Sequence, residues 1–318
     1  MEIFNPNSNV NFLGIRKLSI GVAIGLLIAS IVLIATRGLN YGLDFTGGIS
    51  IVADYEQPVA INDVRNAMVS IHVENPVVTS LGGTREVSIR LQPTQAMLDD
   101  KGKVNLDKVV AVVLPALQAQ RKDATIKSRD YVGSQVGEEL RSDGIIAVIL
   151  VIVGIMLYLW IRFEWRFAVA ALLTEVHDAL VTVGIFALTQ REFDLTVLAS
   201  VLAVVGYSIN DKVVVFDRIR ELFRLARKAE PEEVLNRSIN STLSRTIITS
   251  LFTGITMAAL YFFGGPVVHG FAITMLIGIV VGTLSSIFVA SPILLWLGVS
   301  KQDLMPKTRE NPELARRP

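Results

Sequence analysis

The stretch Leu18–Thr36 reads LSIGVAIGLLIASIVLIAT and contains no charged side chain. A helix needs about 20 predominantly apolar residues to cross a bilayer, so this stretch has the length and composition of a membrane span. It is longer than the roughly 7–15 apolar residues of a cleaved signal peptide, and Thr36-Arg37-Gly38 lacks the small residues of a cleavage site. We therefore interpret the stretch as an uncleaved membrane anchor.

Five further apolar runs follow along the chain. They are Gly144–Ile161, Phe167–Gln190, Leu195–Phe216, Thr246–Phe263 and Phe271–Leu297. This distribution is more decisive than the overall composition, because 51% hydrophobic residues is only slightly above the roughly 45–50% of soluble domains. The sequence thus predicts an α-helical integral membrane protein with six transmembrane helices.

Lysine and arginine residues near the ends of the spans indicate the orientation, since cytoplasmic loops are rich in them. They gather before span one, between spans two and three, between spans four and five, and after span six. These residues are Arg16, Lys17, Arg162, Arg166, Arg218, Arg220, Arg224, Arg227, Lys228, Arg237, Lys301, Lys307, Arg309, Arg316 and Arg317. The two short links on the opposite side contain only one basic residue each, Arg191 and His269. With six spans, all four basic segments share one side, so both termini are predicted to be cytoplasmic.

The segment between the first two spans is then extracytoplasmic and has the size of one small domain. Strand-like and helix-like patterns alternate in it. They fall at Ile49–Tyr55, Ile61–Ile71, Val77–Leu81, Glu86–Leu91, Asn105–Arg121 and Ala124–Val132, with Gly82-Gly83 as a hairpin turn. The order β-α-β-β-α-β is the ferredoxin-like pattern, and Pro115 is expected to kink the second helix.

These observations divide the chain into four parts. Residues 1–37 form the cytoplasmic N-terminus and the first helix, and 38–143 form an α+β ferredoxin-like domain outside the cytoplasm. Residues 144–300 contain transmembrane helices two to six, and 301–318 form a cytoplasmic tail.

Charged side chains within the spans carry most of the functional information, because an Asp, Lys or Arg at a helix centre costs about 2.5–3.5 kcal/mol on insertion scales. The third span contains Glu175, His177 and Asp178. Glu175 and Asp178 are three positions apart and share one face of a helix. Asp178 lies about 18 Å along the helix from Arg166, which is near the middle of the bilayer.

Asp211 in the fourth span and Arg245 at the fifth are expected to form an ion pair. Counted along their helices, they lie about 9 Å and about 12 Å inside the cytoplasmic boundary. A carboxylate and a guanidinium at one depth offset each other's cost of burial. A buried carboxylate can change its protonation when its partner or nearby water moves. Together with Asp178, His177 and Glu175, this pair is therefore a candidate proton pathway.

A structural role is the alternative for the same residues. Intramembrane ion pairs can serve only to fix helix packing, and His177 can be a hydrogen-bonded interior side chain. Lys212 can extend along the helix toward the lipid headgroups. Glu175, one turn nearer the cytoplasm than Asp178, is expected to reach water.

Motifs of soluble enzymes are absent from the sequence. It has no Gly-Lys-Ser/Thr phosphate loop, no His-Glu-x-x-His zinc motif, no Gly-x-Ser-x-Gly turn and no cysteine. The net charge of +1 gives no basic footprint for nucleic acid. We expect neither enzyme activity nor a cofactor or metal ion. An intramembrane aspartyl protease built on Asp178 and Asp211 is a remote alternative.

Several motifs resemble the SecF branch of the SecD/SecF family of protein-export membrane proteins. The stretch Gly42-Leu43-Asp44-Phe45-Thr46-Gly47-Gly48 is similar to the signature that opens the periplasmic domain of that family. Four further stretches are similar to its third, fourth and later spans. They are Val176-His177-Asp178, Gly206-Tyr207-Ser208-Ile209-Asn210-Asp211 with Val215-Phe216-Asp217-Arg218-Ile219-Arg220-Glu221, Leu243-Ser244-Arg245-Thr246 and Phe263-Gly264-Gly265-Pro266. The length resembles that of the SecF branch alone. Glu175 departs from the family pattern, because an apolar residue is expected at its position.

The resemblance implies a member of the resistance-nodulation-division superfamily in the bacterial inner (plasma) membrane, with residues 38–143 in the periplasm. It implies a complex with SecD beside the SecYEG channel, often with YajC. It also implies that the proton-motive force promotes late steps of translocation and release of unfolded preprotein at the periplasmic side. In that picture, Asp211 and Arg245 match residues assigned to proton passage.

Glycines at the start of the periplasmic segment have two interpretations. Gly38, Gly42, Gly47 and Gly48 can act as hinges, because glycine tolerates unusual backbone angles, or they can only form a tight turn into a strand. Two alternatives to the export function also stay open. They are a proton-driven small-molecule efflux transporter and a non-conducting scaffold subunit.

Overall fold

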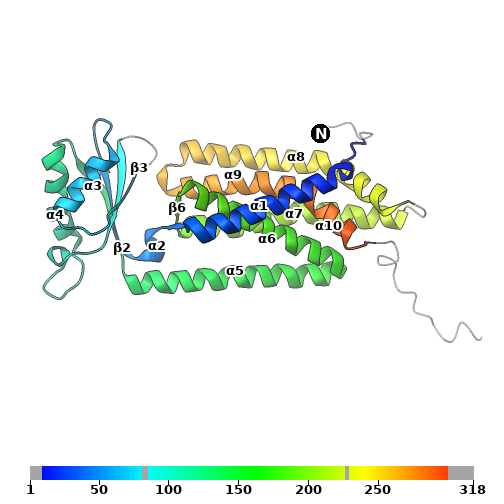
Figure 1. Cartoon of the computed structure of the whole chain (residues 1–318), viewed down its shortest axis with the longest axis horizontal. Coiled ribbons are helices and arrows are strands. Elements are labelled where there is room, and N and C mark those ends of the chain that lie inside the picture. Colours follow the sequence, from blue (N-terminus) through cyan, green and yellow to red (C-terminus); the bar gives the residue numbers. More distant parts are fainter. Residues whose placement is uncertain (1–8, 81–84, 226–228, 300–318) are drawn as a thin grey trace, which may run out of the picture.

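The structure, a computed structural model, describes residues 9–80, 85–225 and 229–299. A bundle of long helices forms one end of the molecule, and a small sheet with two helices forms the other (Figure 1). The predicted tail 301–318, the turn Gly82-Gly83 and the basic residues Arg227 and Lys228 lie outside the described residues.

The six predicted spans are confirmed: within the described ranges, six helical segments are long and apolar enough to cross a membrane. The first five are α1 (Arg16–Arg37), α5 (Ser134–Arg162), α6 (Trp165–Thr189), α7 (Leu195–Leu225) and α8 (Pro231–Phe263). The sixth begins as α9 (Pro266–Ser285) and continues through the π-helical segment η3 (Ser286–Ala290) into α10 (Ser291–Trp296). A short 3₁₀ turn, η1 (Leu13–Ile15), precedes α1.

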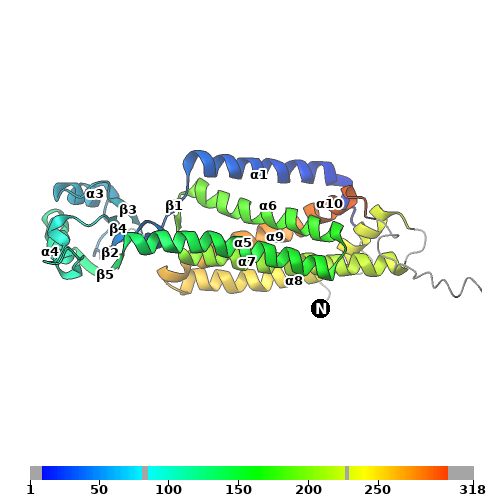
Figure 2. The same cartoon turned by 90° about the horizontal axis from the view of Figure 1, so that it is seen from below.

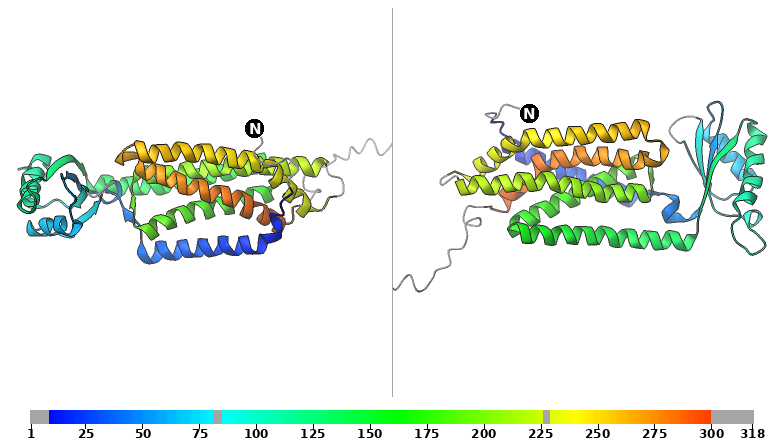
Figure 3. Two further views of the ribbon diagram at one scale, coloured as in Figure 1. Left: turned by 90° about the horizontal axis from the view of Figure 1, so that it is seen from above. Right: turned by 180° about the vertical axis from the view of Figure 1, so that it is seen from behind.

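Helices α6, α7 and α9 form the interior of the bundle. About half of the side chains in their apolar windows are buried, whereas α1, α5 and α8 turn most of theirs outward. Figure 2 shows α1 along one edge and α8 along the opposite edge, and Figure 3 shows α8, α9, α6 and α1 following one another across the bundle. The outer helices therefore present apolar surface of the kind that faces lipid.

Two glycines allow neighbouring helices to approach closely. A Cβ added at Gly278 of α9 would lie 2.2 Å from Cγ2 of Val204 on α7, and one at Gly184 of α6 would lie 2.4 Å from Cβ of Ser30 on α1. Small residues at such contacts are typical of helix association in membranes, where close van der Waals packing replaces the hydrophobic effect. The contact of α7 with α9 matters below, because it brings hydroxyl groups of both helices to one site.

The smaller unit has the predicted succession of strands and helices. It contains β2 (Gly48–Asp54), α3 (Ile61–Ser70), β3 (Val77–Ser80), β4 (Glu86–Leu91), α4 (Leu106–Gln120) and β5 (Thr125–Val132). The strands form an antiparallel sheet in the order β3-β4-β2-β5. Ile49, Ile51 and Ala53 of β2 are fully buried at alternate positions, so one face of the sheet forms the core with α3 and α4. The two helices lie on the side away from the bundle (Figure 1).

Some boundaries differ from the sequence prediction. Helix α5 begins at Ser134 rather than near Gly144, and α8 begins at Pro231 rather than near Thr246. The reason is that hydropathy detects only the apolar part of a helix, while backbone hydrogen bonding continues into polar turns. Helix α4 continues past Pro115.

A two-residue parallel ladder was not predicted at all. Strand β1 (Asn40–Tyr41), just after α1, pairs with β6 (Glu192–Phe193), which lies between α6 and α7. The ladder fixes the start of the smaller unit to the bundle. It is followed by the single helical turn α2 (Leu43–Thr46).

Candidate functional site

A cluster of charged and hydroxyl side chains is buried where α6, α7 and α9 meet. Lys212 of α7 is at its centre and is 0% exposed. Its Nζ donates hydrogen bonds to Oε1 of Glu175 at 2.7 Å, to Oδ2 of Asp178 at 2.8 Å and to Oγ of Ser208 at 2.6 Å. One ammonium group therefore uses all three of its protons on two carboxylates and one hydroxyl.

Asp178 is the most completely bonded member of the cluster. Its Oδ2 accepts from Lys212, from Ser208 at 2.8 Å and from Ser285 at 2.6 Å. Its Oδ1 lies 2.9 Å from Nδ1 of His177. Four donor groups around one carboxylate are an arrangement that stabilises the ionised form, because each bond to a charged acceptor is stronger than a neutral one.

Helix geometry explains why these residues meet. Glu175 and Asp178 are three positions apart on α6, and Ser208 and Lys212 are four positions apart on α7, so each pair shares a helix face. Gly282 brings α9 close to this place, since a Cβ there would lie 2.7 Å from Oγ of Ser208. The approach carries Ser285 to the carboxylate, directly before the π-helical segment η3.

Two expectations about this cluster are wrong. Lys212 does not extend toward the headgroups, and Glu175, only 3% exposed, does not reach water. The two carboxylates of α6 provide Lys212 with counterions inside the bundle. The sequence contained a signal for this pairing, because two carboxylates on one face of a span are stabilised by a nearby cation.

Asp211 is buried next to Lys212 and faces different neighbours. It is 4% exposed, and its electrostatic environment is set by Lys212, by Arg245 and by the hydroxyl of Thr249 on α8. The expected direct ion pair is not among those found in the described part of the chain, where Arg245 lies exposed on α8 and acts on Asp211 through space. The contact that Asp211 makes with α8 is thus looser than the contact that Lys212 makes between α6 and α7.

The remaining residues of the fourth-span motif have separate environments. Tyr207 places its hydroxyl 3.5 Å from Oγ of Ser250 on α8, while Gly206 and Asn210 are exposed on α7. No hydrogen bond joins Asp178 to Asp211 in the described ranges: Asp178 faces His177 and Ser285, whereas Asp211 faces Thr249. Among the residues that the structure describes, no group of three or more His, Cys, Asp or Glu side chains could hold a metal ion.

The glycine-rich signature forms a tight junction between the bundle and the smaller unit. The amide of Gly42 donates to the carbonyl of Phe193 at 2.8 Å, and Oδ2 of Asp44 accepts from the amide of Leu195 at 2.9 Å. Through these bonds the α2 turn is held against β6 and the start of α7. The Thr46 hydroxyl donates to the carbonyl of Gly42 at 3.1 Å, which closes the α2 turn.

Two glycines and one aromatic ring complete the junction. Gly47 and Gly48 have φ angles of +63° and +116°. A Cβ at Gly47 would lie 2.7 Å from Cα of Ser134, so only glycine fits against the start of α5. Phe45 packs among Phe186, Phe193, Val197 and Val201.

An arginine and a glutamate anchor the sheet to the same junction. Nη2 of Arg90 on β4 donates to Oδ1 of Asn40 at 2.9 Å, and its Nη1 lies 3.6 Å from Oε1 of Glu192. Burial raises the pKa of the Glu192 carboxyl, while the nearby Arg90 guanidinium opposes that rise. The junction therefore contains charge as well as close packing.

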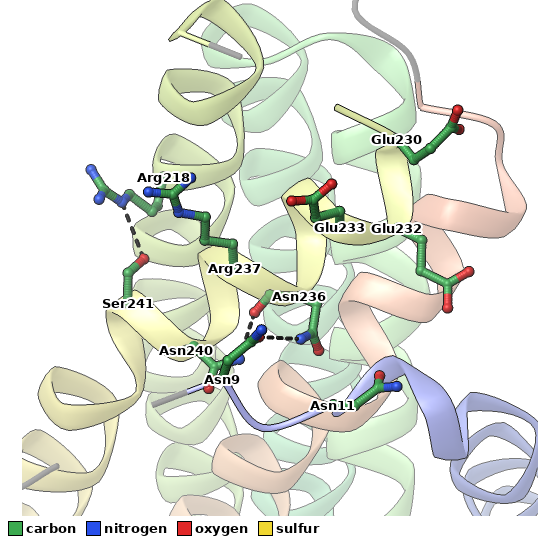
Figure 4. Close-up of a pocket in the computed structure, with 10 residues that line it drawn as sticks. All are labelled: Asn9, Asn11, Arg218, Glu230, Glu232, Glu233, Asn236, Arg237, Asn240 and Ser241. Carbon is green, nitrogen blue, oxygen red and sulfur yellow. Dashed lines mark hydrogen bonds between the residues drawn. The ribbon is translucent and has the colours of Figure 1, made fainter. Parts of the chain in front are cut away.

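At the opposite end of the bundle, the N-terminal segment is attached to α8. Oδ1 of Asn236 accepts from the amide of Phe12 at 2.8 Å, and Oδ1 of Asn240 accepts from that of Val10 at 2.9 Å. Arg16 and Glu232 form an ion pair beside them. A polar hollow of about 820 Å³ lies here (Figure 4). Its lining is Asn9, Asn11, Arg218, Glu230, Glu232, Glu233, Asn236, Arg237, Asn240 and Ser241.

Comparison with known proteins identifies the family. Residues 112–300 match the model of "Protein export membrane protein SecD/SecF, C-terminal", and residues 32–59 match the "SecD/SecF GG Motif". The chain belongs to the SecD/SecF family. The first match includes the Lys212 cluster and Asp211, and the second includes the junction around Gly47 and Gly48.

Curated members of the SecD/SecF family resemble nearly the whole chain. It is 45% identical to the protein translocase subunit SecF of Pseudomonas aeruginosa, over 93% of this chain and 94% of the relative. It is 40% identical to the subunit of the same name from Vibrio alginolyticus, over 96% and 95% of the two chains.

Two solved structures resemble the fold. The crystal structure of SecDF, a translocon-associated membrane protein from Thermus thermophilus, has a TM-score of 0.83 at 35% identity and covers 93% of this chain. This chain spans 39% of that longer one. SecDF in a super-membrane-facing form has a TM-score of 0.67 at 34% identity, covering 93% and 40% of the two chains.

Proposed function

We propose that this chain is a SecF-type accessory subunit of the protein-export machinery, and that it uses the proton-motive force to promote late steps of preprotein translocation and release. The observation that carries this proposal is the group of titratable side chains buried in a SecD/SecF-family helix bundle, with Lys212 at its centre and Asp211 beside it. Ionisable residues inside membrane spans are costly, and they commonly mark ion or proton pathways.

The proposed topology has both termini in the cytoplasm and residues 38–143 as a ferredoxin-like domain in the periplasm. The strand order and antiparallel pairing of the sheet support the ferredoxin-like assignment. Arg162, Arg166 and Arg220 belong to the end of the bundle opposite that domain (Figure 1). Their position supports a cytoplasmic assignment for that end, because basic residues concentrate in cytoplasmic loops.

The proposed proton pathway contains Asp211 and Arg245 together with Asp178, His177 and Glu175. Asp211 is the member of this pathway that exchanges a proton near α8. It has fewer direct contacts there than Asp178 has on the other side of α7. Protonation of Asp211 would remove its attraction to Arg245 and allow α7 and α8 to repack. Because Asp44 joins α2 to the start of α7, such a movement would reach the periplasmic domain.

The available energy sets the scale of this movement. One elementary charge moving through 100 mV provides about 2.3 kcal/mol. That is sufficient to bias a domain between two positions, but it is too little to unfold one. The two SecDF structures, at nearly equal sequence identity, match this chain with TM-scores of 0.83 and 0.67, and this difference supports more than one arrangement of the fold.

The proposed partners are SecD, the SecYEG translocon, YajC and unfolded preprotein. The solved SecDF chain is described as translocon-associated, and this chain corresponds to 39% of it. A separate SecD-type chain would supply the remainder of such an assembly.

The test is preprotein release into the periplasm in cells depleted of the native protein and carrying Asp211→Asn, with and without an imposed proton gradient. We expect the variant to reach the membrane and associate with SecD while release no longer responds to the gradient. Glu221→Gln is the matched control, because it makes the same change of charge at an exposed position on α7. If Asp211→Asn responds as the native chain does, Asp211 is structural. If substitutions of Glu175 and Asp178 are also without effect, the subunit is a scaffold.

A further inference from the structure

The two carboxylates that share Lys212 are bonded very differently. Asp178 accepts from four donor groups, whereas Glu175 accepts one bond, from Lys212 to its Oε1. The other oxygen, Oε2 of Glu175, is buried and has no hydrogen-bond partner. An unpaired oxygen of a buried carboxylate is costly when it carries charge and far less costly when it carries a proton.

The surroundings of Glu175 do not compensate for this missing bond. It borders a cavity of about 20 Å³ between α5, α6 and α7. The other lining side chains are apolar: Ile152, Ile155, Met156, Leu159, Leu172, Val176, Ala179 and Val205. The polar groups facing the cluster come from α6 (His177 and Asp178), α7 (Ser208, Asp211 and Lys212) and α9 (Ser285), with Arg245 of α8 acting on Asp211.

One ammonium group faces two carboxylates in this cluster. If both Glu175 and Asp178 were ionised, they would place two negative charges beside the single positive charge of Lys212 in the interior of the bundle. A proton on Oδ2 of Asp178 would oppose three donors, from Lys212, Ser208 and Ser285, that are already directed at that oxygen. Oε2 of Glu175 has no donor directed at it and is free to bind a proton.

We propose that this cluster is a proton-binding site distinct from Asp211, in which Glu175 binds the proton and Lys212 is the positioning residue that directs it there. This deepens the proposed function, because it names the member of the pathway on α6 that exchanges the proton. Lys212 holds Asp178 ionised through one of its bonds and fixes Glu175 through another.

Proton binding at Glu175 has a consequence for helix packing. A neutral Glu175 keeps a hydrogen bond from Lys212 to its carbonyl oxygen but loses the charge–charge attraction, which is strong in a low-dielectric interior. The charge of Lys212 is then balanced by Asp178 alone. The attraction between α6 and α7 thus depends on one proton, at the place where α9 passes into η3.

Infrared difference spectroscopy on the full-length chain in lipid nanodiscs tests the site. A protonated carboxyl has a C=O stretching band that an ionised one lacks. All carboxyls contribute to this band on acidification, so the Glu175 band is the component that the native chain has and Glu175→Gln lacks. We expect this component to grow on acidification of the native chain, to be missing from Glu175→Gln and to persist in Asp211→Asn. If the spectrum of Glu175→Gln contains the same band as that of the native chain, Glu175 is not the proton acceptor.

Substitutions of Lys212 test its positioning role in the same experiment. In Lys212→Met the Glu175 band is expected to become independent of pH over the range in which it titrates in the native chain. In Lys212→Arg, which restores the charge, the pH dependence is expected to return with a displaced midpoint. Unchanged titration in Lys212→Met contradicts the role. If Lys212→Met does not fold, Lys212→Arg decides: an unchanged midpoint contradicts the role, and a displaced one supports it.

This measurement does not depend on export. If the Glu175 band titrates but Glu175→Gln cells still show a gradient response in preprotein release, the proton site is correct and its coupling to export is not. If the band is absent while Asp211→Asn abolishes the response, the proposed function stands without this site.

Discussion

Lys212 illustrates how a charged residue is retained in the interior of a membrane protein. Its side chain is fully buried, and each of its three protons is used in a hydrogen bond of 2.6–2.8 Å. Removing one partner from a buried ion pair is much more costly than removing a surface charge, because the other charge stays buried. The cluster is therefore sensitive to single substitutions on either α6 or α7.

Surface charges on the smaller unit behave differently, and Asp123 provides a test. Hydrogen bonds from the Arg121 guanidinium, at 3.0 and 2.7 Å, lower the pKa of the Asp123 carboxyl from 3.8 to about 2. A lowered pKa in the folded state stabilises the protein above the ordinary pKa of the carboxyl. This contribution is lost as the pH falls toward the folded-state pKa.

We expect Asp123→Asn to lower the melting temperature of the full chain slightly at neutral pH. The difference from the native chain should disappear as the pH falls from about 4 to about 2, the pKa of the folded state. Thermal unfolding at a series of pH values measures it. The effect is small because solvent screens exposed pairs. A difference that stays constant across this interval would show that the Asp123–Arg121 pair does not contribute through its charge.

At the residue scale, the sequence identified most titratable members of the site but not their partners. Glu175, His177 and Asp178 were singled out because charges are rare in spans. The pairing of Lys212 with Glu175 was missed because it depends on the rotation of α6 and α7 about their axes, which hydropathy does not define. The position of Arg245 relative to Asp211 was misjudged for a related reason, since equal depth in the membrane does not ensure contact.

At the scale of elements, the smaller unit was more predictable than the bundle. Strand β2 begins and ends one residue earlier than predicted, and β4 matches the predicted Glu86–Leu91. Both strands largely alternate apolar and polar residues in the sequence, which is the pattern that predicts a strand. The β1–β6 ladder could not be predicted, because two residues of pairing between Asn40–Tyr41 and Glu192–Phe193 leave no periodic pattern.

Gly47 is one of the glycines on which the junction between these elements depends. Gly47 has a φ of +63°, and a Cβ there would lie 2.7 Å from the backbone of Ser134. We expect Gly47→Ala to separate α2 from the start of α5 and to lower the stability of the protein. The matched control is Gly102→Ala, with a φ of +74° and no atom within 4 Å of the added Cβ. That control tests backbone strain alone, because a non-glycine residue in a left-handed conformation costs about 1–2 kcal/mol.

Thermal unfolding of the two purified variants separates strain from packing. We expect a clearly lower melting temperature for Gly47→Ala than for Gly102→Ala. Equal losses would mean that the contact with Ser134 is unimportant and that the signature needs glycine only for its backbone angles. In that case the hinge interpretation of the glycines would gain support over the tight turn.

At the scale of the whole molecule, the two ends are built differently. One end carries the basic residues and the attachment of the N-terminal segment to α8 through Asn236 and Asn240. The other joins the smaller unit to α1, α5 and α7 through the glycine-rich junction. The charge cluster lies within the helices that connect these ends. Span count and charge bias predicted the overall division, but which helices lie inside depended on close contacts such as Gly278 with Val204.

This arrangement predicts that the smaller unit changes its position relative to the bundle when the buried carboxyls are protonated. The chain has no cysteine, so spin labels can be attached at introduced cysteines without background. Lys122 on the smaller unit and Arg191 at the end of α6 are both exposed and suit Lys122→Cys and Arg191→Cys. Pulsed electron spin resonance on the full-length chain in lipid then gives the distribution of distances between the labels at neutral and acid pH.

We expect the distribution of the labelled native chain to shift or broaden on acidification, because loss of charge at Asp211 or Glu175 weakens the contacts of α7 while the bond from Leu195 to Asp44 transmits its movement. The same labels on an Asp211→Asn background should give one distribution that responds less to pH. Labels on a Glu221→Gln background should respond as the native chain does, since Glu221 is exposed at the far end of α7. Identical distributions at both pH values in all three backgrounds would mean that the junction holds the two parts rigidly, and proton binding would then have to act within the bundle alone.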